Sequence, residues 1–345
     1  MAREAFFYGV LSEALDLQSV GSLVPIPVIY SAYGDMELGE KVILMEDLSK
    51  DYIQSGYYFG GGSPLNWGKD LEAITCLNDY EEIFNSKSLG ITRKAFTLAG
   101  NLHRFYWMDE KISKDPTFSK FIRGAVWREG QFDSFIASQE QALGFWKSTK
   151  EKISSGKSEI KWDQLVIDCV DSSFAKVSIS DFQNQLDTRK FTLVHGDFHP
   201  ANMMYRPSDE RLVLLDFEQI GVGSGPQDLA QYVISHMDPV ERRENERELV
   251  QEYYNTLTNN GAGGEGFVDP KSYSFEECMK DYVEGGSERW VSGCLRRVNA
   301  LCSLLFVYQV SIQTKQNTNT TAAPYFTILL RFGFSRFYLK CAQTT

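Results

Sequence analysis

The sequence predicts an α+β protein with a short, strand-containing front and a large, mainly helical rear. Apolar runs of strand length, bounded by turn residues, occur at 24–30, 41–46, 191–194 and 203–215. Longer amphipathic stretches, with apolar residues near helical spacing, occur at 3–15, 92–109, 131–153 and 228–258. The strands are few and short, and the helices account for most of the chain.

The front of the chain alternates between helical, extended and turn signals. Apolar residues near helical spacing predict a helix over 3–15. Two prolines favour an extended backbone in 24–30, and the pair Gly34–Asp35 predicts a turn. The run 41–46 is then expected to be a buried strand, and the Gly-, Tyr- and Phe-rich segment 50–70 a structured loop.

The rear of the chain contains further strand signals inside a helical background. The apolar run 191–194 predicts a short strand, and Pro207–Glu210 predicts the turn of a hairpin that spans 203–215. The glycine-rich run 261–266 is expected to be a flexible break, after which the tail returns to helix. Within that tail, 298–310 is the most apolar stretch and is expected to be a buried helix, because it is too short to span a bilayer.

Composition excludes several functional classes. With 43% hydrophobic residues among 345, the chain is globular rather than disordered. Its 46 acidic and 35 basic residues give a formal net charge of −11, which argues against a nucleic acid or an anionic membrane as partner. The six cysteines are scattered without a C-x-x-C pair, which predicts reduced thiols, and the first residues lack a signal-peptide core. We therefore expect a soluble, cytoplasmic protein.

The residues that carry chemistry lie in two short stretches. The first runs from Val194 to Met204 and reads Val-His-Gly-Asp-Phe-His-Pro-Ala-Asn-Met-Met, and the second, Leu214–Glu218, reads Leu-Leu-Asp-Phe-Glu. They place one aspartate, an asparagine five residues later, and a second aspartate at the end of the next strand. Phosphoryl transfer needs such parts: one carboxylate to orient the acceptor hydroxyl and take its proton, and a carboxamide and a second carboxylate to hold Mg²⁺.

These stretches resemble the protein-kinase fold. His195 to Asn202 aligns with the loop His-Arg-Asp-Leu-Lys-Pro-x-Asn, and Asp216-Phe-Glu stands where protein kinases have Asp-Phe-Gly. The resemblance implies that Asp197 is the catalytic base and that Asn202 and Asp216 are metal ligands. It also implies that His199 donates to the transferring phosphoryl group in place of a lysine, and that His195 packs as structural support.

The spacing of the motifs distinguishes small-molecule kinases from protein kinases. Only twelve positions separate Asp216 from Asp228, which leaves no room for a peptide-docking activation segment. Gly196 also replaces the arginine that would bind a phosphorylated activation loop. The combination is similar to the aminoglycoside phosphotransferase and choline kinase superfamily, and closest to its ecdysteroid-kinase-like branch. A protein kinase is disfavoured.

The superfamily resemblance implies a kinase-like bilobal fold with a truncated N-terminal β lobe and a large, mainly helical C-terminal lobe. Residues 1–48 would be the remnant of the N-terminal lobe, with helix, strands and hinge. Residues 49–345 would form the C-terminal lobe, with the catalytic loop, the metal site and the acceptor pocket. The stretch Leu98 to Trp107 resembles the superfamily helix that precedes the catalytic loop.

The resemblance extends to the nucleotide site in the front. Ile43–Leu48 is similar to the hinge strand, so Met45, Glu46, Asp47 and Leu48 would offer backbone groups to adenine. Glu4 resembles the helical glutamate that pairs with an ATP-binding lysine.

The sequence departs from the superfamily pattern before Glu4, which only three residues precede. The first strands, the nucleotide-covering loop and the lysine are absent, and Lys41 does not match the lysine's position, because it follows the helix. We expect a truncated form of a small-molecule kinase. The alternative is a nucleotide-binding relative with weak or no catalysis.

Other interpretations of single motifs are weaker. The pair His195 and His199 resembles a zinc pair, but packing is the more common role of a histidine in this loop. Gly60–Asp70 fails as a P-loop, because it lacks a required glycine and the Ser or Thr that binds magnesium. Asp228 is expected to be a helix N-cap whose carboxylate also steadies the catalytic loop. Glu218 is either a partner of the metal ligands or a solvated acid.

The resemblance places an acceptor pocket near Asp281, Glu284 and Trp290, and carboxylates with an indole would suit a cationic acceptor. The alternative is that these residues lie on an ordinary helix, with the two acids exposed to solvent and Trp290 packed in the core. The sequence thus predicts an ATP- and Mg²⁺-dependent phosphotransferase that acts on a hydroxyl of a small molecule, with a pseudokinase as the alternative. It predicts no obligatory protein partner.

Overall fold

The computed structural model describes residues 2–14, 22–66, 80–158, 162–175, 178–284, 325–332 and 335–342. Helices dominate, and the strands form small sheets of two or three members. The α+β class that the sequence predicts is therefore confirmed. Four expected features lie wholly or partly outside the described residues: the buried helix over 298–310, Trp290, the last residue of the helix predicted over 3–15, and residues 67–70 of the loop predicted over 50–70.

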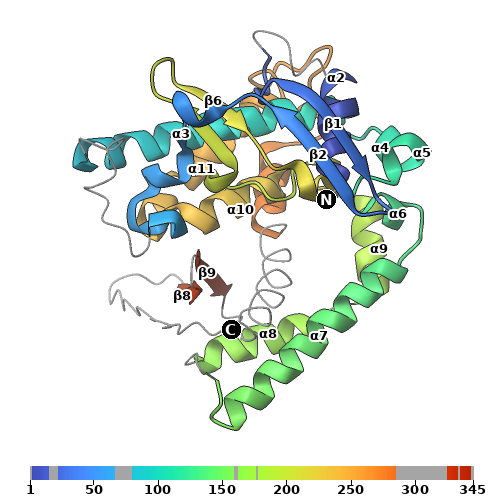
Figure 1. Cartoon of the computed structure of the whole chain (residues 1–345). Coiled ribbons are helices and arrows are strands. Elements are labelled where there is room, and N and C mark those ends of the chain that lie inside the picture. The colour runs from blue at the N-terminus through green and yellow to red at the C-terminus, as the bar shows by residue number, and fades with distance from the viewer. Residues whose placement is uncertain are drawn as a thin grey trace.

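The front consists of a short helical segment packed on a hairpin. The helical segment comprises α1 (Ala2–Phe6), a π-helical turn η1 (Phe7–Leu11) and α2 (Ser12–Ala14). The hairpin pairs β1 (Ile29–Asp35) with β2 (Glu40–Met45) in antiparallel register. Figure 1 shows the hairpin, in blue, beside this segment.

Gly34 sets how closely α1 approaches β1. A Cβ atom at this position would lie 2.9 Å from Ala2 Cα and 2.9 Å from Ala5 Cβ, which is closer than packed side chains tolerate. The absence of a side chain at Gly34 thus allows α1 to lie directly on the hairpin.

Two details of the hairpin differ from the sequence prediction. The turn occupies residues 36–39, after Gly34–Asp35, because β1 continues through Asp35. β2 is also not fully buried: Val42 and Leu44 are 65% and 57% exposed, whereas the alternate residues face α1 and the core. An apolar run alone did not distinguish a strand buried on both faces from one covered on a single face.

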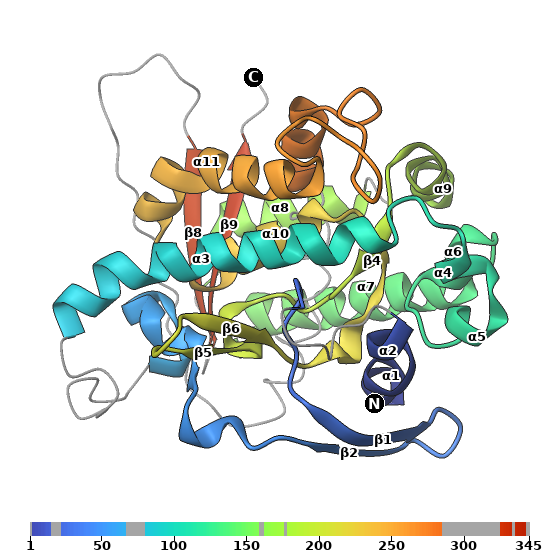
Figure 2. The ribbon, with the colours of Figure 1, turned by 90° about the horizontal axis from the view of Figure 1, so that it is seen from above.

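The rear is built around three helices that pack together. Figure 2 shows α3 (Tyr80–Phe105) running beside α10 (Pro226–His236) and α11 (Pro239–Leu257). Arg93 of α3 bonds Glu248 and Glu252 of α11, which ties the two helices together. The helical character predicted over 228–258 is confirmed, and it is divided between α10 and α11 because Asp238 caps a new helix at Pro239.

Two small sheets lie between the front and these helices. One has the order β3-β5-β6, and the other pairs β4 with β7. Their bounds are β3 Ile53–Gln54, β4 Thr192–Val194, β5 Met203–Arg206, β6 Arg211–Leu214 and β7 Gly221–Gly223. The predicted strand at 191–194 and the hairpin over 203–215 are both confirmed. The loop predicted at 50–70 contains 3-10 turns: η2 (Leu48–Lys50), η3 (Ser55–Gly62) and η4 (Pro64–Asn66).

The remaining helices cover one side of the molecule. In chain order they are α4 Lys111–Lys114, α5 Pro116–Ser119, α6 Ala125–Arg128, α7 Asp133–Ser154, α8 Gln164–Ala175 and α9 Ile179–Thr188. Figure 1 shows α7 and α8 extending away from α3, α10 and α11. The predicted helix over 131–153 corresponds to α7.

The C-terminal tail only partly follows the sequence prediction. Residues 275–284 form the helix expected after the glycine-rich break. Farther on, however, β8 (Tyr325–Phe332) pairs antiparallel with β9 (Ser335–Ala342), so the expectation of a wholly helical tail is wrong. This segment is rich in aromatic and β-branched residues, which favour strands.

Two sequence expectations concern the environment of the chain. Among the described residues, no helix is both long and apolar enough to cross a membrane. Cys278 is free and buried, whereas Cys169 is disulfide-bonded, so the prediction of reduced thiols is wrong for Cys169.

Candidate active site

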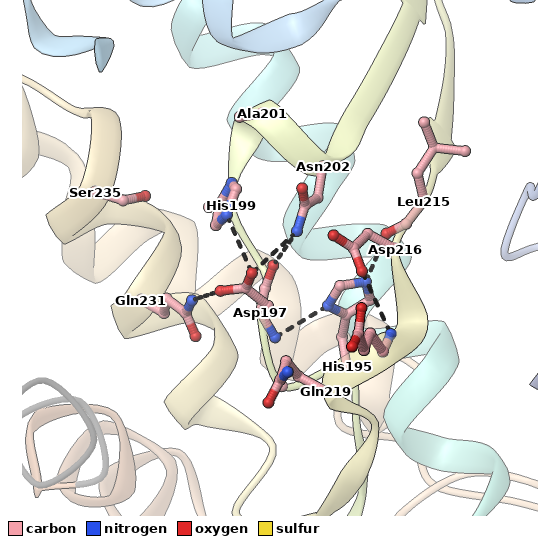
Figure 3. A network of polar contacts seen from close by, with 12 residues as sticks. His195, Asp197, His199, Ala201, Asn202, Leu215, Asp216, Gln219, Gln231 and Ser235 are labelled. Atoms are coloured by element: carbon pink, nitrogen blue, oxygen red, sulfur yellow. Dashed lines mark hydrogen bonds and ion pairs between the residues drawn. The ribbon is translucent and has the colours of Figure 1, made fainter. Parts of the chain in front are cut away.

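The catalytic loop connects β4 to β5 and holds Asp197 in a defined position. Gln231 Nε2 donates to Asp197 Oδ1 at 2.7 Å, and Asn202 Nδ2 lies 3.3 Å from Oδ2. Asn202 also donates to the Asp197 backbone carbonyl at 3.0 Å, and His199 Nε2 lies 3.5 Å from Oδ2. Figure 3 shows these side chains pointing toward Asp197. The carboxylate keeps about a quarter of its surface exposed, so a hydroxyl can reach it.

Asp228, which lies on α10 (Pro226–His236), fixes the start of this loop. Its carboxylate is fully buried and accepts the backbone N–H of His195 at 2.7 Å and that of Gly196 at 3.2 Å. His103 Nε2 lies 3.4 Å from the same carboxylate. These contacts support the loop, but the expectation of an N-cap is wrong: Gly225 is the N-cap, and Asp228 is the third residue of α10.

His195 links the catalytic loop to the segment that carries the second aspartate. Its Nε2 bonds the Leu215 carbonyl at 2.8 Å, and its Nδ1 accepts the Asp197 backbone N–H at 3.2 Å. Burial lowers the pKa of His195, although the carboxylate of Asp228 opposes this. A neutral imidazole with the proton on Nε2 satisfies both bonds, so His195 acts as a rigid spacer between the two motifs.

Gly196 has a backbone conformation that glycine adopts without strain. Its φ is +87°, in the left-handed region that other residues avoid. With this backbone conformation the Gly196 N–H donates to Asp228, and the carboxylate of the next residue, Asp197, accepts from Gln231. A glycine at this position therefore serves the geometry of the loop.

Asn202 and Asp216 are brought together by the pairing of β5 with β6. Asn202 closes the 3-10 turn η6 (Pro200–Asn202), and its carbonyl accepts the Leu215 N–H at 2.9 Å, which places it beside Asp216. Asp216 has φ +60° and ψ +64° and caps the turn η7 (Phe217–Gln219) with one carboxylate oxygen, 3.4 Å from the Glu218 nitrogen. Such strained backbone is frequent at functional sites.

The donor set at Asn202 and Asp216 fits Mg²⁺. Asn202 uses its Nδ2 group to bond Asp197, which turns its Oδ1 away from that carboxylate. The capping bond of Asp216 is long, so its carboxylate remains available. Hard oxygen donors, one carboxylate and one carboxamide, are the ligands that Mg²⁺ takes alongside phosphate oxygens. The described residues contain no group of three or more His, Cys, Asp or Glu side chains arranged as a self-sufficient metal site.

Phe217 connects the metal-site segment to the front helix. Its buried ring stacks on Phe7 with centroids 3.5 Å apart and an interplanar angle of 9°. The His195 ring lies 4.7 Å from that of Phe217 and is tilted by 56° to it. Ring contacts thus connect η1 through Phe217 to the catalytic loop, so a displacement of the front segment would also displace Asp216.

His199 packs on a second histidine that the sequence did not identify. The His199 and His236 rings are stacked, with centroids 5.6 Å apart and an interplanar angle of 18°. His236 is buried and bonds Ser235 through Nδ1 at 2.8 Å. His199 Nδ1 and His236 Nε2 are buried without a hydrogen-bond partner. Burial and the neighbouring His199 lower the pKa of His236 well below its usual value.

Glu4 faces the site from α1 and pairs with Lys41 of β2. The Lys41 Nζ atom lies 2.7 Å from Glu4 Oε2 and 3.9 Å from Glu218 Oε2. Burial raises the pKa of Glu4, and the hydrogen bond from Lys41 offsets this only in part. Sequence comparison did not assign Lys41 to Glu4, because the pairing depends on how the hairpin folds back over the helix.

The expected hinge follows β2. Glu46 is fixed by two bonds to Val28: its backbone N–H donates to the Val28 carbonyl, and its side chain accepts the Val28 N–H, both at 2.9 Å. Asp47 caps η2 by accepting the Ser49 N–H, and Leu48 is buried. Met45 ends β2. The segment therefore has an ordered backbone, and its role toward adenine stays a prediction.

The residues expected around the acceptor have partners within the protein. Asp281 is buried and accepts the Tyr273 hydroxyl at 2.9 Å, and burial raises its pKa. Glu284 accepts a bond from Arg189 at 2.6 Å. Trp290 lies outside the described residues. Asp281 is therefore not on a solvated face, and its bond to Tyr273 gives it a structural role.

Gln231 is the site residue that sequence reasoning missed most clearly. It lies three positions after Asp228 on α10, so both side chains project from one face of the helix. Asp228 accepts a backbone N–H of the catalytic loop, and Gln231 donates to the carboxylate of Asp197. The spacing of Asp228 and Gln231 was a signal that could have identified this residue.

Comparison with known families identifies the segment that contains the catalytic loop. Residues 110–262 match the model of the ecdysteroid kinase-like family. The matched segment includes both aspartates of the site and α10. A comparison with curated proteins found no match.

Proposed function

We propose, because residues 110–262 match the model of the ecdysteroid kinase-like family, that this protein transfers the γ-phosphoryl group of ATP to a hydroxyl of a small molecule. The family match supports a kinase-like enzyme with a bilobal fold and a helical rear lobe. The proposal includes transfer from ATP, the role of each residue, a cytoplasmic location, and the division into lobes at 1–48 and 49–345.

The observation that carries the proposal is the hydrogen-bonded position of Asp197. Gln231 and Asn202 hold its carboxylate by two N–H donors, at 2.7 and 3.3 Å, while part of it stays exposed. In this role Asp197 accepts the proton of the acceptor hydroxyl as the hydroxyl oxygen bonds to the γ-phosphorus and the bond to the β-phosphate oxygen breaks. ADP and the phosphorylated acceptor are the products.

Asn202 and Asp216 are the residues that would hold Mg²⁺. Bound there, the ion supplies positive charge to the phosphate oxygens. His199 would donate to the transferring group, because its ring lies next to Asp197 and is held in place by its stack on His236. Asp228 and His195 position the loop and do not take part in the reaction.

A pseudokinase is the competing interpretation, and the arrangement of the loop argues against it. A protein that only binds nucleotide has no need of an oriented carboxylate at Asp197. Yet the partner Gln231 is placed on α10 so as to bond that carboxylate. This supports catalysis over binding alone.

A thermal-shift titration with Mg·ATP tests the nucleotide site. Binding to the folded state raises stability by RT ln(1 + [L]/Kd), about 2.7 kcal/mol at a hundredfold excess over Kd. We expect a Mg²⁺-dependent shift in the parent chain that is lost in Asp216→Asn and kept in the exposed control Asp168→Asn. ADP release in the presence of hydroxyl compounds then tests transfer. A parent chain with neither the shift nor the release contradicts the proposal.

A further inference from the structure

Gln231 lies on the side of Asp197 that faces away from the candidate metal site. Figure 3 shows Asn202 and Asp216 to the right of the Asp197 carboxylate and Gln231, on α10, to its left. In an in-line phosphoryl transfer the acceptor oxygen and the leaving oxygen lie on opposite sides of the phosphorus. Because the proposed function assigns Mg²⁺ and the phosphates to the side of Asn202 and Asp216, the acceptor approaches Asp197 beside Gln231.

The carboxamide of Gln231 bonds the protein through only one of its two ends. Its Nε2 donates to Asp197 Oδ1 at 2.7 Å, and Figure 3 shows Oε1 turned away from that carboxylate. This contact fixes the orientation of the amide, because in the reversed orientation Oε1 would face another acceptor oxygen. Oε1 is buried, yet it has no hydrogen-bond partner among the described residues.

The oxygen of Gln231 is therefore an acceptor that requires a donor. Gln231 is only 8% exposed, so bulk solvent does not satisfy Oε1 as it satisfies a surface amide. The large majority of buried polar atoms in folded proteins are hydrogen-bonded, because an unpaired one costs free energy. The neighbouring Asp197 keeps about a quarter of its side chain exposed, so a small molecule can reach this part of the site.

We propose that Gln231 Oε1 accepts a hydrogen bond from the acceptor molecule, which therefore carries a second donor beside the hydroxyl that receives the phosphoryl group, as in a 1,2-diol. The inference rests on the proposed function, because it narrows the class of acceptor for that reaction. Nε2 and Oε1 belong to one amide, so the hydroxyl at Asp197 and the donor at Oε1 must be close together in the molecule. Groups on adjacent carbon atoms meet this requirement.

Gln231 thereby acts at both ends of its amide. Nε2 orients the carboxylate of Asp197, and Oε1 selects the acceptor. A carboxamide oxygen accepts hydrogen bonds and does not donate them, so an ether oxygen in place of the second hydroxyl gives no bond. A site built to bond a hydroxyl discriminates against analogues that lack it, because its own polar group is then left unpaired.

Three related alcohols test this selection: cis-cyclohexane-1,2-diol, cis-2-methoxycyclohexanol and cyclohexanol. The methyl ether keeps the second oxygen but has no donor there, and cyclohexanol lacks the second oxygen altogether. We measure kcat/KM for each as ADP release with Mg·ATP. The value for the diol should be about 5- to 100-fold higher than for either of the others, the effect of pairing one buried acceptor.

Substitution of Gln231 separates selection of the acceptor from positioning of Asp197. Gln231→Met has neither end of the amide, so turnover of all three alcohols should fall. The diol should then exceed cyclohexanol by less than about twofold in kcat/KM. Gln231→Lys keeps an N–H donor for Asp197 without an acceptor oxygen, so it should regain part of the turnover and none of the preference.

Gln251→Met is the matched control, because Gln251 lies on α11 and its amide bonds Asn255 at 2.9 Å. We expect this control to keep both the turnover of the parent chain and its preference for the diol. Thermal melting of each variant without ligand checks that it is folded.

The outcomes distinguish the two proposals. A parent chain that releases ADP with none of the three alcohols overturns the proposed function, and the inference with it. A parent chain that turns over cyclohexanol or the methyl ether as well as the diol leaves phosphoryl transfer standing and overturns the role of Oε1. If Gln231→Met lowers every rate but keeps the preference for the diol, Gln231 acts only through Asp197, and the inference is again overturned.

Discussion

The carboxylate of Asp228 lies 2.7 Å from the backbone nitrogen of His195, although 33 residues separate them in the chain. With the second bond to Gly196, this contact determines where the catalytic loop leaves β4. Helix α10 therefore positions the loop that carries Asp197 through two side chains. Asp228 bonds the backbone at the start of the loop, and Gln231 bonds the carboxylate of Asp197.

Replacing Asp228 by Asn should destabilise the fold. The amide offers one acceptor where the carboxylate offers two, so one of the N–H groups of His195 and Gly196 loses its partner in a fully buried place. We expect a loss of about 1–3 kcal/mol in the free energy of unfolding, measured by urea denaturation. Asp168→Asn, on the exposed face of α8, should change it by less than about 0.5 kcal/mol. Equal stability of the two variants would refute the supporting role.

Replacing Asp197 by Asn should remove turnover and leave the fold intact. The amide cannot accept the hydroxyl proton, so we expect the rate of phosphoryl transfer to fall by about 10²- to 10⁴-fold. Nucleotide affinity should stay within about threefold of the parent, because Asn202 and Asp216 are unchanged. The readout is ADP release beside a Mg·ATP titration, with exposed Asp181→Asn as the control. Undiminished turnover in the variant would mean that Asp197 is not the base.

Replacing Gly34 by Ala should displace the front helix. The added methyl would lie 2.9 Å from Ala2 Cα, so α1 must shift together with Glu4. We expect a destabilisation of about 1–3 kcal/mol and weaker binding of Mg·ATP. Gly90→Ala is the matched control, because a Cβ atom there meets nothing within 4 Å and alanine favours the helix. It should be neutral or stabilising by up to about 1 kcal/mol. If both variants behave alike in chemical denaturation, the close approach at Gly34 does not matter.

Stability should decrease as pH falls below about 6.5, the value expected for histidine in the unfolded chain. Burial lowers the pKa of both His195 and His236 in the folded state. Between the folded and unfolded pKa values the unfolded chain binds more protons, so lowering the pH favours unfolding. Each histidine adds a slope of up to about 1.4 kcal/mol per pH unit.

The His236→Asn variant isolates one of the two contributions. We expect its unfolding free energy to depend less steeply on pH between 6.5 and 5 than that of the parent chain. The slope that remains combines His195 with carboxyl groups such as Glu4 and Asp281, whose pKa burial raises and which act in the opposite direction. Denaturation curves at several pH values measure this, and a slope unchanged by the substitution would rule out a buried neutral His236.

Local sequence predicted most of the elements and the candidate site residues. The hairpin over 203–215 followed from two apolar runs and a turn signal, because both are encoded within a few residues. Asp197, Asn202 and Asp216 could be predicted as site residues because the loop and the following strand are close in sequence, and the segment that matches the family includes all three. Local sequence did not predict the helix break at Asp238, the exposed face of β2 or the β8–β9 hairpin, because these features depend on neighbouring elements.

The sequence by itself thus determined the class of fold, the catalytic loop and its resemblance to the ecdysteroid kinase-like branch. Only the tertiary structure decided which side chains serve that loop. Gln231, His236 and Lys41 reach the site from α10 and β2, and nothing in their local sequence encodes their partners. The physical reason is that a motif is a local pattern, whereas an ion pair or a ring stack depends on how distant elements pack. Lys41 meets Glu4 across 37 residues because the β1–β2 hairpin folds back on α1 at Gly34.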